Sequence, residues 1–301
     1  MKYIIGIDAG GTKTEAVAYN QDGTEISRGV ASFGNPVIHQ EIAFENIKSS
    51  IQSCLSKLHA DRCVGIVSGV AGIEANNNRL ALYHNLNRLF HVPITVLNDA
   101  ELSYFSLLKG DDGILTIAGT GSVSIGYHNK KMYMCGGWGH LLGDEGSAYD
   151  IAIQAIKSAI VDFEMGLPIH SLTADLLNKM NVINVPEIKS FVYKEQKSMI
   201  ASLSEVVDYH AQKGDLRAAN ILQQAGNSLA LQTITLLKRL SLANTVKVGY
   251  RGSVLEKNKI VLQHFQQRLT DYNAKIKFVH SCTSSAIGGY YYAQKHEYFK
   301  A

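Results

Sequence analysis

The chain has 301 residues, of which 46% are hydrophobic and 18% are charged, and its formal net charge is +3 at neutral pH. A chain of this length and composition can bury a large apolar core and is long enough for two domains of ordinary size. Its lysines and arginines are scattered, which argues against nucleic-acid binding, and no segment resembles a membrane span or a signal peptide, so we expect a cytoplasmic protein.

The first half of the chain begins with strands. Alternating side chains predict three short strands between Tyr3 and Val30, with Asp22-Gly23 as the hairpin turn between the second and the third. Apolar residues at helical spacing then predict a helix over residues 40–59. Four more elements complete this half: a strand from Cys63 to Ala71, a helix from Arg79 to Phe90, a strand from Ile94 to Leu97 and a short helix after Asp99.

The second half repeats this order of elements. It has strands at Ile114–Ala118, Val123–Tyr127 and Lys131–Cys135, a long helix from about Ser147, helical segments over 171–241, strands at Thr245–Gly249 and Lys275–His280, and a closing helix at Thr283–His296. The alternation favours an α/β fold with mainly parallel sheets and an antiparallel edge. We predict two related lobes with a cleft between them. The first is 1–110, with the C-terminal helix, about 285–301, packing back on it, and the second is 111–284, with a helical insertion at 171–241.

The four cysteines are far apart in the sequence, at Cys54, Cys63, Cys135 and Cys282. Zinc sites and disulfide frameworks use cysteines at short, paired spacings. We therefore expect reduced cysteines with a structural role.

The first glycine-rich segment, Gly6 to Thr14, nearly matches a P-loop but has one extra residue before its Lys-Thr pair. The residues after it alternate as a strand does, whereas a P-loop or a dinucleotide-binding loop must open a helix. The loop therefore joins two strands. Gly10, Gly11, Thr12 and Lys13 are either donors to a phosphate or parts of a tight β-turn, and Asp8 beside them favours a magnesium-nucleotide site.

The segment from Ala118 to Ser122 has the same arrangement, an apolar strand before it and an alternating strand after it. Glycines allow consecutive backbone N–H groups to converge on an anion. Two such hairpins, each beginning one of two similar halves, can bind a polyphosphate from both sides, with Gly119, Thr120 and Gly121 in the second. This arrangement resembles that of the actin-like ATPase superfamily.

Asp99 follows a predicted strand and precedes a short helix, so it lies at the sheet edge where α/β folds bind their ligands. An aspartate at this position can also cap the helix. However, Asn98 and Glu101 already form the pattern of a capping box. Asp99 is therefore free for another role.

The segment from Cys135 to Tyr149, CGGWGHLLGDEGSAY, is the most specific in the chain. Its glycines admit a ligand, Trp138 offers an apolar face and Asp144 can accept hydrogen bonds from hydroxyls, as a sugar pocket requires. Asp144 or Ser147 could instead cap the following helix. The segment closely resembles the signature of N-acetylglucosamine kinases and of BadF/BadG/BcrA/BcrD-type ATPases. All the glycine loops occur in that family's order, so the resemblance covers essentially the whole chain.

The resemblance implies a two-lobed actin-like ATPase fold, with duplicated ribonuclease H-like domains and the active site in the cleft between the lobes. It also implies an ATP-dependent kinase that phosphorylates the 6-hydroxyl of an amino sugar, with N-acetylglucosamine as the first choice, and it is compatible with a homodimer. Asp99 would be the catalytic base. The sugar would be bound by Asn35, Asp99, Ser122, Gly137, Trp138, Gly139, Asp144 and Ala148.

The same resemblance implies how ATP and Mg²⁺ are bound. Asp8 would hold the metal through water. The nucleotide would be bound by Gly10, Gly11, Thr12, Lys13, Gly119, Thr120, Gly121, Gly249, Gly252 and Ser253. In the third of these loops Tyr250 and Arg251 separate two glycines that are often adjacent in relatives, which leaves the adenine contacts open.

Three alternatives remain. The substrate could be glucosamine or N-acetylmuramic acid, which a single sequence does not resolve. The protein could be a BadF/BadG-type ATPase that activates a partner enzyme, but the iron–sulfur cluster of such proteins needs ligand cysteines, and Cys135 has no second cysteine nearby. A sugar-binding protein without catalysis is disfavoured because both Asp99 and Asp144 are present.

Overall fold

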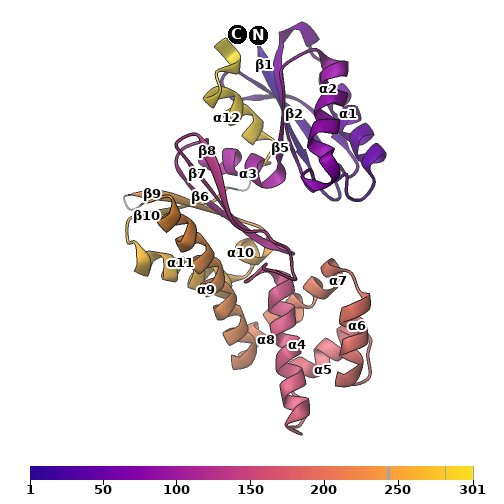
Figure 1. Cartoon of the computed structure of the whole chain (residues 1–301), viewed down its shortest axis with the longest axis vertical. Coiled ribbons are helices and arrows are strands. Elements are labelled where there is room, and N and C mark those ends of the chain that lie inside the picture. Colours follow the sequence, from indigo (N-terminus) through magenta and orange to yellow (C-terminus); the bar gives the residue numbers. More distant parts are fainter. Residues whose placement is uncertain (243–244, 282, 301) are drawn as a thin grey trace. The chain divides into compact units, whose positions relative to one another are not determined.

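The computed structural model describes residues 1–242, 245–281 and 283–300. The chain forms two compact units (Figure 1), the first made of Met1–Asp112 with His280–Ala301 and the second of Gly113–Val279. The first unit thus ends two residues beyond the expected position 110. Cys54, Cys63 and Cys135 are free thiols, while Cys282 lies outside the described residues.

The first unit contains a five-stranded sheet in the order β3-β2-β1-β4-β5. Its strands are β1 (Tyr3–Ala9), β2 (Thr14–Asn20), β3 (Glu25–Ala31), β4 (Cys63–Val70) and β5 (Ile94–Asn98). β1 pairs antiparallel with β2 and parallel with β4. The outer strands continue this pattern on each side: β3 is antiparallel to β2, and β5 is parallel to β4.

The sheet of the second unit has the same topology, in the order β10-β9-β6-β7-β8. Its strands are β6 (Gly113–Ala118), β7 (Ser122–His128), β8 (Lys131–Gly136), β9 (Val246–Arg251) and β10 (Ile276–Val279). β6 takes the place of β1, because it is antiparallel to β7 and parallel to β9. The predicted duplication of one α/β unit is therefore present in the fold.

The expectation of mainly parallel sheets was wrong. Each sheet has as many antiparallel neighbours as parallel ones. The reason is the connections: the first three strands of each unit are joined by hairpins, which force antiparallel pairing, and only the later strands return through helical crossovers.

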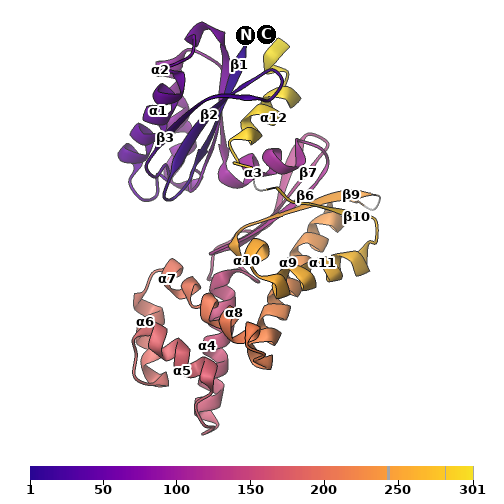
Figure 2. The ribbon, with the colours of Figure 1, turned by 180° about the vertical axis from the view of Figure 1, so that it is seen from behind.

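Helices cover both faces of the first sheet (Figures 1 and 2), with α1 (Gln40–Leu55) and α2 (Asn78–Phe90) on one face and α3 (Asp99–Leu108) and α12 (Ile287–Lys295) on the other. Alternate residues of β1 therefore face opposite helices, and Ile5 and Ile7 pack with Ile47 of α1. Single turns of 3-10 helix lie at Ala60–Arg62, Ala75–Asn77 and Tyr298–Lys300.

The last helix packs unusually close to the first strand. A Cβ at Gly6 of β1 would come within 1.9 Å of the Ala286 carbonyl oxygen, and one at Gly289 within 2.6 Å of Gly6 Cα. A Cβ at Gly288 would lie 2.1 Å from the Leu102 carbonyl oxygen of α3. Only glycine permits these approaches. The helix begins at Ile287, later than the expected Thr283.

In the second unit α9 (Leu216–Arg239) packs against β6, β7 and β8, and α11 (Lys259–Tyr272) lies beside it. The remaining helices are α4 (Ala148–Glu164), α5 (Ser171–Met180), α6 (Ile188–Lys194), α7 (Lys197–Ser202), α8 (Ser204–Gln212) and α10 (Ser253–Lys257), with a 3-10 turn at Val185–Glu187. α4 to α8 form a helical bundle beyond the sheet (Figure 2). The described helices include none with the length and hydropathy that crossing a bilayer requires.

Candidate nucleotide and sugar site

The first glycine loop joins β1 to β2, as the strand period predicted. The Gly10 N–H donates to the Lys13 carbonyl at 2.9 Å, and the Gly10 carbonyl accepts from the Gly34 N–H at 2.9 Å. Gly11, Thr12 and Lys13 are exposed, and a Cβ at Gly11 would have no atom within 4 Å. The tip of the loop is thus open to a ligand.

Lys13 is held at the base of this loop by Glu15. Its Nζ lies 2.9 Å from Glu15 Oε1, and Glu15 also pairs with Arg28 and accepts a hydrogen bond from Ser284 Oγ at 2.6 Å. Burial raises the pKa of Glu15, but the hydrogen bonds from Ser284 and Lys13 and the charge of Arg28 outweigh it and lower the pKa below its usual value. Glu15 is therefore a stable anion that orients Lys13.

Asp8, Asn35 and Asp99 come to the same edge of the first sheet. Asp8 is half-buried at the end of β1 and pairs in register with Gly69 of the parallel strand β4. Asn35 is half-buried in the loop after β3, and its Oδ1 accepts from the Val37 N–H at 2.9 Å. Since carboxyl ends of parallel strands share one edge, these polar groups converge where α/β sheets bind ligands.

Asp99 is the first residue of α3. The predicted capping box is confirmed, because the Asn98 side chain accepts from the Glu101 N–H at 2.7 Å and the Glu101 carboxylate accepts from the Asn98 N–H at 2.9 Å. Asp99 itself is exposed and accepts from the Ala100 N–H at 3.0 Å. The protein packed behind its carboxyl raises its pKa above 3.8, and the N–H groups of Ala100 and Asp99 counter this rise in part.

Arg79 was not among the predicted site residues, yet it supports the turn that carries Asp99. Its Nη1 donates to the Val96 carbonyl of β5 at 2.7 Å, and its Nη2 lies 3.3 Å from Glu101 and also pairs with Glu74. A pattern search could not have found these contacts, because they join α2 to a strand and a helix that follow it in the chain.

The second glycine loop is tied to the Cys135–Tyr149 segment. The Gly119 carbonyl accepts from the Ala148 N–H at 2.8 Å. Ser122 donates twice, from its N–H to Asp144 Oδ1 at 3.0 Å and from its Oγ to the Glu145 carbonyl at 2.9 Å. Ser122 is buried, and both of its donors are used in hydrogen bonds within the protein. The loop and the segment form one hydrogen-bonded structure.

Asp144 is 3% exposed and has a left-handed backbone, with φ of 66°. Its Oδ2 lies 2.5 Å from Nζ of Lys197, a residue of α7 that sequence reasoning missed. No local signal could have indicated this partner, because the two residues are 53 positions apart. Ser147 caps α4, accepting from the Asp150 N–H at 3.2 Å, so of the two residues considered for this role Ser147 is the cap and Asp144 is not.

The first part of the Cys135–Tyr149 segment, around Trp138, is exposed. Trp138 is 70% exposed, and its neighbours Gly137 and Gly139 have positive φ angles of 75° and 83°. The His140 ring packs on Tyr149, with the ring centroids 4.8 Å apart. Trp138 thus presents its face to solvent on a turn that only glycines can flank easily.

The third loop meets the second at Gly252. A Cβ at this residue, whose φ is 95°, would come within 2.3 Å of the Ala118 carbonyl oxygen. Ser253 then begins α10. Gly249, in contrast, lies inside β9, opposite Leu115 and Val279. The structure therefore brings Gly252 and Ser253 to the second loop but leaves Gly249 within the sheet.

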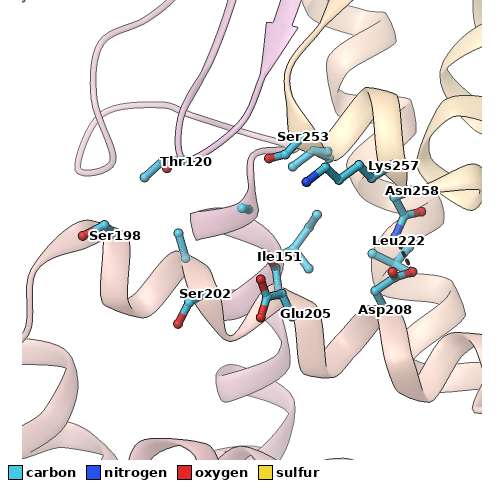
Figure 3. A pocket seen from close by; sticks show the side chains of 14 residues that line it. Thr120, Ile151, Ser198, Ser202, Glu205, Asp208, Leu222, Ser253, Lys257 and Asn258 are labelled. Atoms are coloured by element: carbon cyan, nitrogen blue, oxygen red, sulfur yellow. Dashed lines mark hydrogen bonds between the residues drawn. The ribbon is translucent and has the colours of Figure 1, made fainter. Parts of the chain in front are cut away.

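A cavity of about 280 Å³ lies beside these two loops in the second unit (Figure 3). In Figure 3 Thr120, Ser253 and Lys257 lie along the upper side of the cavity, and Ser198, Ser202 and Glu205 lie along the lower side. The other lining residues are Ala148, Ile151, Ala201, Ser204, Asp208, Leu222, Val254 and Asn258. Ala148, predicted to contact a sugar, thus also lines this cavity.

The polar side chains that line the cavity differ in whether they already have a partner within the protein. Asp208 Oδ1 accepts from Asn258 Nδ2 at 2.7 Å, which fixes one wall. Glu205 is largely exposed, with a weak contact of 3.8 Å to Lys179. Lys257 lies on the opposite wall and is exposed. The cavity therefore offers hydroxyl groups, one cation and one available carboxylate beside an apolar floor formed by Ile151 and Leu222, a combination suited to a nucleoside with phosphates.

The chain is similar to known proteins over nearly all of its length. Residues 5–293 match the model of the BadF/BadG/BcrA/BcrD ATPase family. An N-acetylmuramic acid/N-acetylglucosamine kinase of Clostridium acetobutylicum is 30% identical over 96% of this chain and 97% of its own. An N-acetyl-D-glucosamine kinase of Dictyostelium discoideum is 27% identical over 94% and 95%.

A solved structure from Chromobacterium violaceum has the same fold. Its TM-score is 0.71 and its identity 19%, and the match covers 96% of this chain and 98% of that one.

Proposed function

Because the chain belongs to the BadF/BadG/BcrA/BcrD ATPase family, we propose that it is an ATP-dependent kinase that phosphorylates the 6-hydroxyl of an amino sugar, with N-acetylglucosamine as the first candidate. Both curated relatives named above are kinases of N-acetylated sugars. The Clostridium acetobutylicum relative is named for two sugars, so N-acetylmuramic acid is a second candidate substrate. Glucosamine, the other alternative from the sequence, is the third.

The observation that carries the proposal is the cavity beside the second and third glycine loops. Its lining includes Thr120 and Ser253, two residues that we predicted for nucleotide binding from different parts of the sequence. Its volume of about 280 Å³ is near the lower end of the range for small-molecule pockets, roughly 300–1,000 Å³. In this cavity Glu205 is suited to accept hydrogen bonds from ribose hydroxyls, and Lys257 is suited to a phosphate.

Asp99 is the proposed catalytic base. Its carboxylate is exposed and is not used to cap α3. A raised pKa favours proton acceptance, because a base works best when its pKa approaches the working pH. Asp99 would orient the sugar hydroxyl and accept its proton, while the loop N–H groups and Lys13 bind the phosphates.

Mg²⁺ would be held by Asp8. Among the described residues there is no group of three carboxylates, histidines or cysteines that could surround a metal. A single half-buried carboxylate at the strand end fits Mg²⁺ in particular, since this ion keeps several waters and takes further ligands from phosphates. The metal would supply charge neutralisation at the phosphates.

Within the first unit the residues proposed for sugar binding are Asn35 and Asp99, and within the second unit they are Trp138, its flanking glycines and Asp144. The exposed Trp138 ring can stack on the apolar face of a sugar. Asn35 Nδ2 has no hydrogen-bond partner within the part of the chain that the structure describes, so it can donate to a sugar hydroxyl. Asp144 and Ser122 are already bonded, and a sugar would add to these contacts.

A coupled assay of ADP release tests this proposal. Purified protein is given ATP and Mg²⁺ with N-acetylglucosamine, N-acetylmuramic acid, glucosamine, N-acetylmannosamine or glucose, and the phosphorylated product is identified by its mass and its fragmentation. We expect release that depends on an N-acetylated sugar. ATP hydrolysis of equal rate with every sugar and with none would refute the kinase proposal and favour an ATPase that acts on a partner.

A further inference from the structure

Lys197 reaches from the helical insertion to the second glycine loop. It is the first residue of α7, and its Nζ lies 2.5 Å from Oδ2 of Asp144. The Asp144 side chain is only 4% exposed, against 30% for that of Lys197. A Cβ at Gly121 would come within 2.9 Å of both Lys197 Nζ and Asp144 Oδ1. The ion pair therefore packs directly on the loop, and a Cβ at Gly121 would force it to shift.

The contact continues from Asp144 into the loop backbone. Asp144 Oδ1 accepts from the Ser122 N–H at 3.0 Å, and the Gly137 N–H donates to the Ser122 carbonyl at 3.0 Å. The Lys197 ammonium, the buried Asp144 carboxylate and the Ser122 N–H are thus connected by consecutive polar contacts. The orientation of Ser122, and with it that of Gly121 before it, depends on where the Asp144 carboxylate is held.

The same helix that carries Lys197 forms a wall of the cavity. Ser198, Ala201 and Ser202 of α7 line it, and Ser198 and Ser202 lie across the cavity from Thr120 in Figure 3. α7 has only six residues, so a ligand that displaces this wall also displaces Lys197. The short helix α7 is a physical connection between the cavity and the loop.

We propose that Lys197 is a positioning residue that holds the second glycine loop through Asp144 and links that loop to the occupancy of the cavity. This inference rests on the proposed function of the loop and cavity in nucleotide binding. Lys197 neutralises a carboxylate that is otherwise buried without a counter-charge, which is an unfavourable state that the surroundings relieve by moving or by admitting water.

The first test compares Lys197→Met with Lys194→Met. Lys194 is an exposed lysine at the end of α6, three positions earlier, and it serves as the matched control for loss of one positive charge. ADP binding is measured by calorimetry without sugar, and melting temperatures verify that each variant is folded. We expect affinity for ADP to fall about tenfold in Lys197→Met and to stay unchanged in Lys194→Met. Affinity within twofold of the parent protein in Lys197→Met would overturn the proposal.

A double variant separates positioning from direct contact with phosphate. In Asp144→Asn combined with Lys197→Met no buried charge remains, and the amide oxygen of the new side chain can still accept from the Ser122 N–H. We expect this double variant to bind ADP about as well as the parent, and Lys197→Arg to retain most of the affinity. If the double variant binds as weakly as Lys197→Met, Lys197 contacts the nucleotide itself and the positioning role is wrong.

These measurements do not need sugar phosphorylation. A protein that binds ADP but phosphorylates none of the sugars would refute the kinase proposal and leave the role of Lys197 to be decided by the binding data. Conversely, a functional sugar kinase whose Lys197→Met variant binds ADP normally would refute only the inference about Lys197.

Discussion

Asn98 and Glu101 exchange hydrogen bonds at the start of α3, each accepting from the backbone N–H of the other. This reciprocal pair satisfies the helix terminus without Asp99, which stands between them in the sequence. Helix stability and the proposed proton transfer therefore depend on neighbouring but different side chains, and a substitution can remove one without the other.

Asp99→Asn is expected to lower kcat for sugar phosphorylation by a factor of about 10² to 10⁴, the usual contribution of a general base. Because Asp99 is exposed and is not the helix cap, the melting temperature should stay within about 2 °C of the parent. Steady-state kinetics and thermal unfolding measure the two effects. Asp61→Asn, an exposed aspartate in the same unit, is the control, and a near-normal kcat in Asp99→Asn would contradict the assignment.

The pH dependence of kcat should report the same carboxyl. Asp99 must be ionised to accept a proton, and the protein packed behind its exposed carboxyl raises its pKa above 3.8. The ionised fraction, and with it kcat, falls as the pH falls through this raised pKa, so the acid limb lies at higher pH than for an ordinary aspartate. Rates are measured over the pH range in which the melting temperature shows the protein folded. The residual activity of Asp99→Asn should lack this limb.

Gly11→Ala distinguishes a phosphate-binding loop from a plain turn. A Cβ at Gly11 has no protein atom within 4 Å, and the backbone there is not in the left-handed region, so the folded protein accommodates the methyl group. If backbone N–H groups of the loop bind phosphates, the methyl group obstructs their approach and KM for ATP rises about tenfold or more at unchanged melting temperature. A variant with normal KM would indicate that the loop is only a turn.

Trp138→Ala tests the exposed part of the sugar site. Since this side chain is 70% exposed, its removal should change the free energy of unfolding by less than about 0.5 kcal/mol. Stacking on a sugar would be lost, so we expect KM for the sugar to rise about tenfold while KM for ATP is unchanged. Trp138→Phe should recover part of the sugar affinity. Equal KM values for Trp138→Ala and the parent would remove Trp138 from the site.

Local patterns predicted the elements of this fold well. The alternation after Thr14 predicts the strand that follows the first glycine loop, and Asn98 and Glu101 predict the capping box; the structure has both. Each of these patterns spans only a few consecutive residues, so it can be recognised without knowing the fold. The pairing of the strands was harder, because the share of parallel neighbours depends on which connections are hairpins and how the crossovers return.

The partners of the site residues could not be predicted. Lys197 and Asp144 meet only because α7 folds back over the loop, and Arg79 meets Val96 across a helix and a strand. Gly249 shows the opposite case: it is the last residue of an expected strand and a predicted nucleotide contact, but β9 continues to Arg251 and holds Gly249 between two other strands. Nearness in sequence does not indicate nearness to the ligand.

The close packing of Gly6 against Ala286 and Gly289 has a consequence for how the protein is made. Met1–Asp112 is synthesised long before α12, so one face of the first sheet is covered only in part, by α3, until the chain is almost complete. The second unit is continuous in sequence and can finish folding earlier. The half of the molecule that is synthesised first is therefore the last to acquire its full structure.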